Sequence, residues 1–301
     1  MLRYAAIDIG SNAIRMLFEE VYDTGNGIGF KKLTLVRLPV RLGEDAFVSG
    51  RISDKKRGQL IQMGHSFNYL CSIFEVQGYR ATATSAMRDS ENGQEIIEEI
   101  LEKTGVQIEI IPGEEEANIL YEGILNTGRI NAEESYMLID VGGGSTEINF
   151  FRNGERVDWH SFDLGTVRLK EGIQRNDSWD EFDAWIQEMV AKYEPKYAVG
   201  TGGNINKFYK LCGHKNWENL TVQELRDQIE YLKGFTPEEM VQKLDVKRDR
   251  ADVIIPGGMI YLRAMERGGI DEMIVPKVGL ADGLIRRQYF EDQEAQTTME
   301  A

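Results

Sequence analysis

Two stretches of the chain, residues 4–20 and 136–152, share one pattern of apolar and polar positions. In each, an apolar run of strand length leads through a glycine-containing turn into a second apolar run, and Asp8 and Asp140 stand at the same position before the turn. Short apolar runs bounded by glycine are typical of buried strands. Each stretch therefore predicts a strand, a tight turn and a second strand.

The segments that follow the two stretches are also alike. A further hairpin signal, at residues 23–27 and 152–155, precedes a predicted strand that ends in Leu-Gly, at residues 42–43 and 164–165. Because the same order of signals occurs twice in one register, the pattern indicates a three-stranded unit that is used twice.

Helices and strands alternate after each unit. The spacing of apolar residues predicts a helix from the Ser53/Asp54 cap signal to Gly78, and residues 79–89 predict a strand that runs into a loop. The further predicted elements are helices over 93–105, from Gly113 and over 179–193, strands over 106–112, 197–203 and 272–277, and a final helix after Gly279. This alternation predicts two α/β domains with mixed sheets and a cleft between them.

We expect the first domain to cover residues 1–124 and the second to cover 125–284, with a boundary in the polar segment after residue 125. The C-terminal helix, over about residues 285–301, is expected to pack back on the first domain.

Net charge and composition disfavour some classes of binding partner. The net charge of −15 disfavours nucleic-acid binding because long-range repulsion opposes it. The sequence shows no signal pattern and no apolar run near the roughly 20 residues that span a bilayer, so we expect a soluble, cytoplasmic protein without a membrane partner. Cys71 and Cys212 are far apart in the sequence, which predicts two small buried thiols.

The two glycine turns predict an anion-binding site. Glycine at positive φ lets consecutive backbone amides point at one anion, and the hydroxyls of Ser11, Ser145 and Thr146 add donors. Asp8 and Asp140, at the ends of the preceding strands, suit a magnesium ion held largely through water. The alternative for each aspartate alone is a cap of its own turn.

Further charged residues are candidates for the same anion-binding site. Arg15 lies where the second copy has Glu147, so one turn offers a guanidinium and the other a further acid. Arg88 follows a predicted strand and is a second candidate for anion binding, with a solvated surface arginine as the alternative. The glutamates at 114–116 start a helix, where such residues are usually solvated and favour the helix dipole, although one that faces the cleft would orient or deprotonate water.

In these motifs the chain resembles the exopolyphosphatase/guanosine pentaphosphate phosphohydrolase (Ppx/GppA) phosphatases of the actin-like ATPase superfamily. The resemblance runs in order from residue 4 to about residue 287, and its most specific parts are the first turn with GSN, the GEEEAN segment and the GGGSTE turn. It implies two duplicated ribonuclease H-like (actin-like) domains. It also implies Mg2+ or another divalent cation as cofactor, with K+ as a stimulating ion.

The resemblance assigns roles to the matching residues. It implies that Glu116 activates the attacking water, that Asp140 and Glu147 position the water and a metal ion, and that Asp8 lies opposite them as a further metal ligand. The residues implied to bind phosphoryl oxygens are Ser11, Asn12, Arg15, Arg88, Gly142, Gly143, Gly144, Ser145 and Thr146.

The implied activity is release of terminal phosphate from inorganic polyphosphate or guanosine pentaphosphate, and a homodimer is the expected assembly. Two alternatives stay open. An ATP-dependent small-molecule kinase of the same fold would use the segment at 199–204 to contact adenosine. A polyphosphate or alarmone sensor without efficient turnover is compatible with Ala13 and Ala281, which replace a hydroxyl residue and an arginine of the family pattern. The candidate residues for guiding a long polyanion are Lys247, Arg248, Arg250, Arg168 and Lys170.

Overall fold

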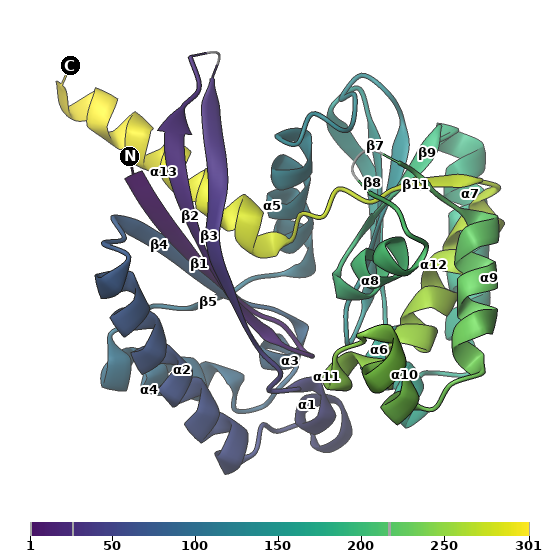
Figure 1. The fold of residues 1–301 in the computed structure, drawn as a ribbon, viewed down its shortest axis with the longest axis horizontal. Helices are drawn as coiled ribbons and strands as arrows, with labels where there is room; N and C mark the ends of the chain where they lie inside the picture. Colours follow the sequence, from purple (N-terminus) through teal and green to yellow (C-terminus); the bar gives the residue numbers. More distant parts are fainter. Residues whose placement is uncertain (1, 26, 216–217, 301) are drawn as a thin grey trace. The chain divides into compact units, whose positions relative to one another are not determined.

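The chain forms two compact units, each built on one mixed sheet (Figure 1). The computed structural model describes residues 2–25, 27–215 and 218–300. The first unit runs to Gly123 and resumes at Gly279, and the second runs from Ile124 to Val278. Residues 1 and 301, which end the predicted domain ranges, lie outside the described residues.

The first unit contains a five-stranded sheet in the order β3-β2-β1-β4-β5. β1, β2 and β3 pair antiparallel, whereas β4 is parallel to β1 and β5 is parallel to β4. The strands are β1 (Leu2–Ile9), β2 (Ile14–Asp23), β3 (Ile28–Leu38), β4 (Gly78–Ala83) and β5 (Glu109–Ile110). The helices are α1 (Gly43–Ser49), α2 (Asp54–Ile73), α3 (Ser85–Arg88), α4 (Gly93–Thr104), α5 (Gly113–Leu125), whose last two residues are counted with the second unit, and α13 (Leu280–Glu300).

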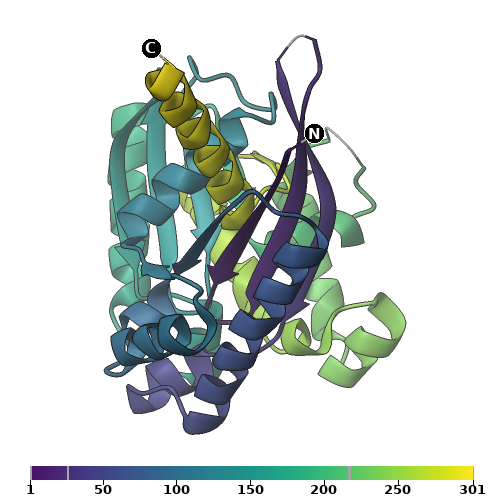
Figure 2. The same ribbon diagram turned by 90° about the vertical axis from the view of Figure 1, so that its left-hand side faces the viewer.

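Alternation along β1 divides its side chains between the two faces of this sheet. Ala5, Ile7 and Ile9 pack in one apolar cluster with residues of α2 and α4. Tyr4 and Ala6 pack in another cluster with residues of α5 and α13. Figure 2 shows α2 and α13 on opposite sides of the strands. Because side chains alternate along a strand, Asp8 at the end of β1 is on the same face of the sheet as Tyr4 and Ala6, the face that α5 and α13 cover.

Charged groups join α13 to the first sheet. Lys32 Nζ of β3 lies 2.6 Å from Asp282 Oδ1, and the Arg286 guanidinium stacks on the ring of Phe30 at 4.7 Å. Glu19 of β2 is only 1% exposed. Burial first, and then the Asp282 carboxylate, raise the pKa of Glu19 from 4.5 to about 7.

We expect Glu19→Gln to change the pH dependence of stability. Since the folded-state pKa of Glu19 lies above its ordinary value, the free energy of unfolding should fall as pH rises from 4.5 through about 7. Glutamine has no such titration, so the variant should be more stable than the wild type at pH 8, by up to about 3 kcal/mol, and nearly equal at pH 4.5. Urea unfolding at both pH values measures this, with the exposed Glu102→Gln as control. Parallel pH profiles for wild type and Glu19→Gln would contradict it.

The second unit contains a six-stranded sheet in the order β10-β11-β9-β6-β7-β8. Its antiparallel β6, β7 and β8 and the parallel neighbour β9 repeat the arrangement of β1, β2, β3 and β4. The strands are β6 (Tyr136–Val141), β7 (Thr146–Arg152), β8 (Glu155–Phe162), β9 (Tyr197–Thr201), β10 (Leu220–Thr221) and β11 (Glu272–Ile274). The helices are α6 (Thr166–Glu171), α7 (Ser178–Tyr193), α8 (Gly203–Leu211), α9 (Val222–Lys233), α10 (Pro237–Leu244), α11 (Arg248–Ala251) and α12 (Ile254–Gly268).

Local sequence signals account for several of these boundaries. Asn153 and Gly154 both adopt positive φ, 53° and 80°, as a two-residue hairpin turn between β7 and β8 requires. Thr221 and Thr236 start α9 and α10 with capping boxes, in which the threonine hydroxyl accepts from a backbone amide three residues later and a glutamate returns the bond.

The structure corrects several predicted boundaries. α2 ends at Ile73 rather than Gly78, because Glu75 turns the chain at a φ of 52° and Gly78 already begins β4. The predicted loop that carries Arg88 is the short helix α3. The strands predicted to end in Leu-Gly stop earlier, at Leu38 and Phe162, and the predicted strand over 106–112 is reduced to β5.

The two thiols, which were predicted to be buried, lie at the edges of the apolar clusters and are only partly buried. Burial still raises the pKa of Cys71 and of Cys212 to about 11. No helix in the described part of the chain is both long and apolar enough to cross a membrane.

Candidate active site

The glycine turn of the second unit is bound to the start of α6 through its carbonyl groups. The amide of Gly142 donates to the carbonyl of Ser145 at 2.9 Å and closes the turn. The carbonyls of Gly142 and Gly143 accept from the Thr166 and Val167 amides at 3.0 and 2.8 Å. The third carbonyl, that of Gly144, accepts from Arg168 Nε at 2.7 Å.

These bonds orient the amides of the turn. In a planar trans peptide the C=O and the following N–H point in opposite directions. Since the carbonyls of Gly142, Gly143 and Gly144 point toward α6 and Arg168, the amides of Gly143, Gly144 and Ser145 point away from them. Consecutive amides that point to one side are the donors of an anion nest.

The turns contain glycine for a different reason than the predicted positive φ. Neither Gly10 nor the glycines at 142–144 adopt positive φ. A Cβ on Gly142 would come within 3.2 Å of the Ser145 carbonyl oxygen, and one on Gly10 within 3.2 Å of the Ala13 carbonyl oxygen. Gly165, before α6, packs against the turn so closely that a Cβ would lie 2.3 Å from Gly143 O. Gly10, Gly142 and Gly165 therefore permit a close backbone approach in and beside the turns.

Two acidic residues lie side by side next to this turn. Asp140 at the end of β6 is the direct ladder partner of Glu147 on β7. Glu147 Oε1 accepts from Ser145 Oγ at 2.6 Å and from Ser161 Oγ at 2.9 Å. Asp140 Oδ1 accepts from Thr201 Oγ1 at 2.7 Å. Ser145 was predicted to bind phosphoryl oxygens, and in the structure its hydroxyl is directed to Glu147.

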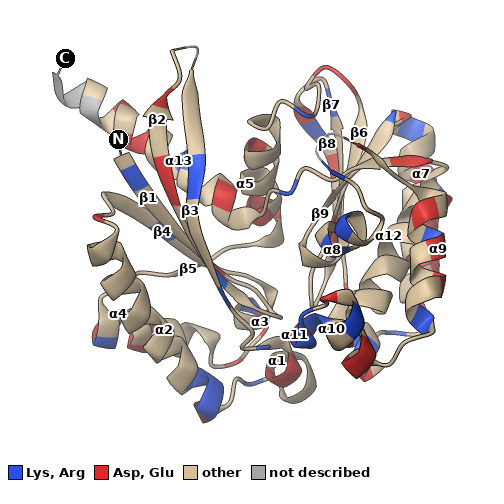
Figure 3. Ribbon diagram, in the orientation of Figure 1, with Lys and Arg blue, Asp and Glu red and all other residues tan. Residues whose placement is uncertain are grey.

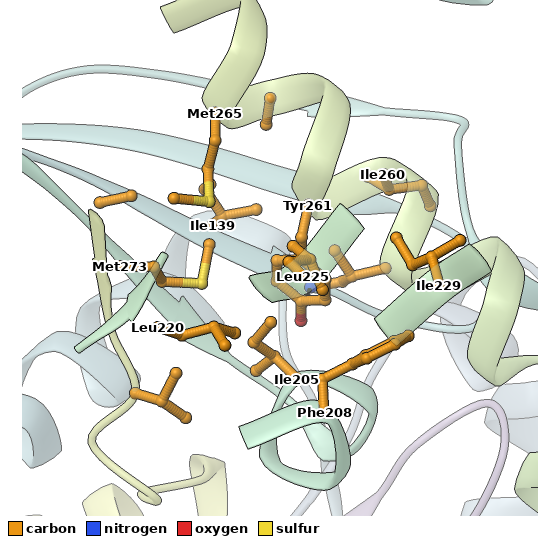
Figure 4. Packing of buried hydrophobic residues seen from close by; sticks show 14 of the residues in the cluster. Ile139, Ile205, Phe208, Leu220, Leu225, Ile229, Ile260, Tyr261, Met265 and Met273 are labelled. Carbon is orange, nitrogen blue, oxygen red and sulfur yellow. Dashed lines mark hydrogen bonds between the residues drawn. The ribbon is translucent and has the colours of Figure 1, made fainter. Parts of the chain in front are cut away.

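The strand ends that carry Asp140 and Thr201 are joined by a buried tyrosine of α12. The hydroxyl of Tyr261 donates to the carbonyl of Thr201, and it accepts from the amide of Val141 at 3.3 Å. Figure 4 shows the Tyr261 ring among the apolar side chains of the second unit's core. Burial, and then the charge of Asp140, hold the pKa of the Tyr261 hydroxyl well above its usual value, so it remains a neutral donor.

The first unit repeats this hairpin with different charges. Asp8 is the ladder partner of Arg15, and Arg15 Nη1 donates to Asp8 Oδ2 at 2.7 Å. Where the second unit opposes two acids, the first opposes an acid and a base. The predicted phosphate-binding Arg15 and the predicted metal ligand Asp8 therefore form an ion pair, with Asp8 4% exposed.

The turn of the first unit is also held through its carbonyls. The Gly43 amide donates to Ser11 O at 2.8 Å, and the Arg41 amide donates to Asn12 O at 3.1 Å. The hydroxyls of Ser11 and Ser85 lie 2.8 Å apart, which joins the turn to the start of α3. By the same peptide geometry, the amides of Asn12 and Ala13 point away from the segment at 41–43.

Arg88 and the three glutamates at the start of α5 belong to one region of the first unit. Arg88 Nη1 donates at 3.0 Å to the carbonyl of Ile111, just before α5. Glu114 is exposed, whereas Glu115 forms an ion pair with Arg287 of α13. Glu116 is half-buried in the first turn of the helix. The structure thus distinguishes three glutamates that are equivalent in the sequence pattern.

Sequence reasoning missed Ser161, Thr201 and Tyr261 altogether, and it placed Arg168 among residues that guide a chain. The hydroxyls of Ser161 and Thr201 carry no local motif. The sequence does carry a signal for Arg168. This residue lies three positions after Gly165, at the start of the helix that follows the third strand of the repeated unit. The ion pairs of Lys170 with Asp252 and Glu171, at 3.0 and 3.1 Å, favour a structural role for that lysine.

Comparison with known proteins identifies relatives along nearly the whole chain. A model of the Ppx/GppA phosphatase family matches residues 21–290. Exopolyphosphatase 1 of Mycobacterium tuberculosis is 26% identical, over 99% of this chain and 90% of that protein. Exopolyphosphatase 2 of the same species is 27% identical, over 94% of this chain and 98% of that protein.

Solved structures have the same fold. The crystal structure of the Ppx/GppA family member from Aquifex aeolicus matches with a TM-score of 0.77 and 24% identity, over 97% of this chain and 98% of that one. An exopolyphosphatase from Cytophaga hutchinsonii matches with a TM-score of 0.81 and 19% identity, over 93% and 96%. These matches confirm the predicted fold class of two duplicated ribonuclease H-like (actin-like) domains with mixed sheets. With a family-model match over most of its length, the chain belongs to the Ppx/GppA phosphatase family.

Proposed function

We propose that this protein is an exopolyphosphatase that releases terminal phosphate from inorganic polyphosphate, with guanosine pentaphosphate as a second candidate substrate. Membership of the Ppx/GppA phosphatase family and the similarity to two mycobacterial exopolyphosphatases support this proposal. The observation that carries it is the turn at 142–145. Its amides point away from α6 and its neighbours are the opposed carboxylates of Asp140 and Glu147.

The residues have complementary tasks in this proposal. The turn amides, Arg15 and Arg88 bind phosphoryl oxygens, and Glu116 orients the attacking water and accepts its proton. Phosphoryl transfer proceeds through a loose transition state with charge spread over the equatorial oxygens, so positioning and electrostatics supply most of the acceleration. Proton acceptance by a general base adds about 10²- to 10⁴-fold.

Asp140 and Glu147 fit a magnesium ion. Opposed carboxylates on neighbouring strands repel each other, and a divalent cation relieves this repulsion. Among the described residues, no three histidine, cysteine or acidic side chains group as a metal site. A pair of carboxylates suits Mg2+, which usually keeps several water ligands. When bound, the ion would offset the negative charge of the phosphoryl oxygens, and we include Asp8 as a further predicted ligand and K+ as a predicted stimulating ion.

Basic residues of the second unit are proposed to attract a long polyanion despite the net charge of −15. Lys247 and Arg248 are exposed at α11, where Figure 3 shows lysine and arginine together. Arg250 of the same helix packs against Gly203, where a Cβ would lie 2.5 Å from Arg250 Nη2. Local positive charge raises the concentration of an anionic substrate near the site.

The decisive experiment is timed phosphate release from polyphosphates of several lengths, guanosine pentaphosphate and ATP, with Mg2+ and K+ and with each ion omitted. We expect release from polyphosphate without any acceptor, and loss of release on chelation of Mg2+. Transfer from ATP that requires an acceptor would instead indicate the kinase alternative. Calorimetric binding of polyphosphate or guanosine pentaphosphate without release would indicate the sensor alternative, and either outcome would overturn the proposal.

A further inference from the structure

Three hydroxyl groups donate to the two opposed acids of the second unit. Ser145 and Ser161 both bond to Glu147 Oε1, at 2.6 and 2.9 Å, and Thr201 bonds to Asp140 Oδ1 at 2.7 Å. Ser145 belongs to the turn itself. Ser161 and Thr201 come from β8 and β9, the strands that flank the β6–β7 hairpin on either side.

The two acids need these hydrogen bonds in order to keep one orientation. Asp140 and Glu147 oppose each other directly across the ladder, and like charges in that position repel. A carboxylate that is free to rotate would turn away from its neighbour. A hydroxyl that donates to one defined oxygen restricts this rotation and stabilises the charged form of the acid.

The donors are themselves fixed by the sheet. Ser161 is the ladder partner of Glu147, so the backbone register brings its hydroxyl to the carboxylate. Thr201 is the ladder partner of Asp140 and is 1% exposed, and its carbonyl accepts from the buried Tyr261 hydroxyl. Each acid therefore has one donor on the strand beside it.

We propose that Ser161 and Thr201 are positioning residues that hold Glu147 and Asp140 in the orientation used for phosphoryl transfer. This inference rests on the proposed function and deepens it, because it assigns tasks to two residues outside the glycine turns and the acidic motif. Neither residue needs to touch the substrate, and each acts through the acid to which it donates.

The side chains next to the two acids and the turn do not change in the variants that test this proposal. Arg168 is bound to the turn at Gly144, Arg250 packs against Gly203, and Tyr261 lies under the strand ends. A change in kcat or in the orientation of either acid then reports on the hydroxyl that was removed.

The test compares Ser161→Ala and Thr201→Val with the wild type in polyphosphate hydrolysis. Ser161 is exposed, so alanine leaves no cavity, and valine has nearly the shape of threonine. We expect kcat to fall by about 10- to 100-fold with KM little changed, as for other residues that orient catalytic groups. This split between kcat and KM distinguishes a positioning role from a contact with the substrate, whose loss would raise KM.

Matched variants distinguish a positioning role of Ser161 and Thr201 from a role in packing alone. Thr201→Ser and Ser161→Thr keep a hydroxyl and should recover most of the lost kcat. Ser178→Ala removes a buried hydroxyl of the same unit that has no hydrogen-bond partner among the described residues, and it should behave like the wild type. In a Glu147→Gln background, Ser161→Ala should cause no further loss. If Thr201→Val fails to fold, Thr201→Ala takes its place.

A second readout does not depend on turnover. In a crystal structure of Ser161→Ala, the Glu147 carboxylate should leave the single orientation in which it accepts from Ser161 Oγ at 2.9 Å in the wild type. If the wild type releases no phosphate, the proposed function fails while the orientation of the Glu147 carboxylate still decides the effect of the hydroxyl. Folded Ser161→Ala and Thr201→Val proteins with wild-type kcat and with Glu147 and Asp140 in their wild-type orientations would overturn the inference.

Discussion

Replacing Glu116 with glutamine is expected to reduce phosphate release from polyphosphate by about 10²- to 10⁴-fold, the range typical of a lost general base. The amide has nearly the shape of the carboxylate but cannot accept a proton from water. Because Glu116 is half-buried at the helix start and its own amide bonds to the carbonyl of Pro112, the change should leave α5 intact. Steady-state kinetics with long-chain polyphosphate measure kcat and KM, and only kcat should fall.

The neighbouring glutamate provides the control. Glu114 lies in the same first helical turn but is exposed, so Glu114→Gln should retain wild-type kcat. Glu115 is less suitable because it pairs with Arg287, and its loss would affect the packing of α13. Wild-type phosphate release by Glu116→Gln, or an equal loss in Glu114→Gln, would contradict the role assigned to Glu116.

A second large effect is expected from Gly165→Ala. The new Cβ would lie 2.3 Å from Gly143 O and 2.3 Å from Gly144 C, and these neighbours are backbone atoms that cannot rotate away. The backbone φ of −126° accommodates alanine, so the strain comes from the contact alone. We expect the free energy of unfolding to fall by about 3 kcal/mol, in the range of overpacked cores. Displacement of the turn by about 1 Å should lower kcat roughly 10²-fold.

Gly58→Ala is the matched control for this substitution. A Cβ on Gly58, in the interior of α2, would meet no atom of the described residues within 4 Å beyond its chain neighbours and the backbone of its own helix, and alanine should stabilise the helix by about 0.5–1 kcal/mol. Urea unfolding and phosphate release measure both variants. A Gly165→Ala protein with the stability and kcat of the wild type would show that the turn tolerates a side chain beside it.

Much of the fold could be predicted because the chain repeats a local pattern. The hairpins after Asp8 and Asp140 follow from short apolar runs and glycine, and the turn at Asn153 and Gly154 follows from residues that accept positive φ. These signals act between neighbours in the sequence. The end of α2 was predicted wrongly because Glu75 adopts positive φ without being glycine.

The candidate site was predictable only in part. Opposition of Asp140 to Glu147 and of Asp8 to Arg15 follows from a four-residue turn between paired strands. The roles of these residues stay predictions. The bond between Glu115 and Arg287 could not be deduced, since the two residues lie 172 positions apart in the chain.

The residue of β8 that pairs with Glu147 could not be predicted from local sequence, because it depends on the register of the two strands. The two-residue turn at Asn153 and Gly154 alone would set His160 opposite Glu147. A register shift between Phe150 and Phe151 brings Ser161 there instead. The sequence by itself determined the repeated hairpins, their turns and the acids beside them, because those depend on local conformation. Only the tertiary structure decided the bulge, the hydroxyl donors and the ion pairs of α13, because these depend on packing between segments that are distant in sequence.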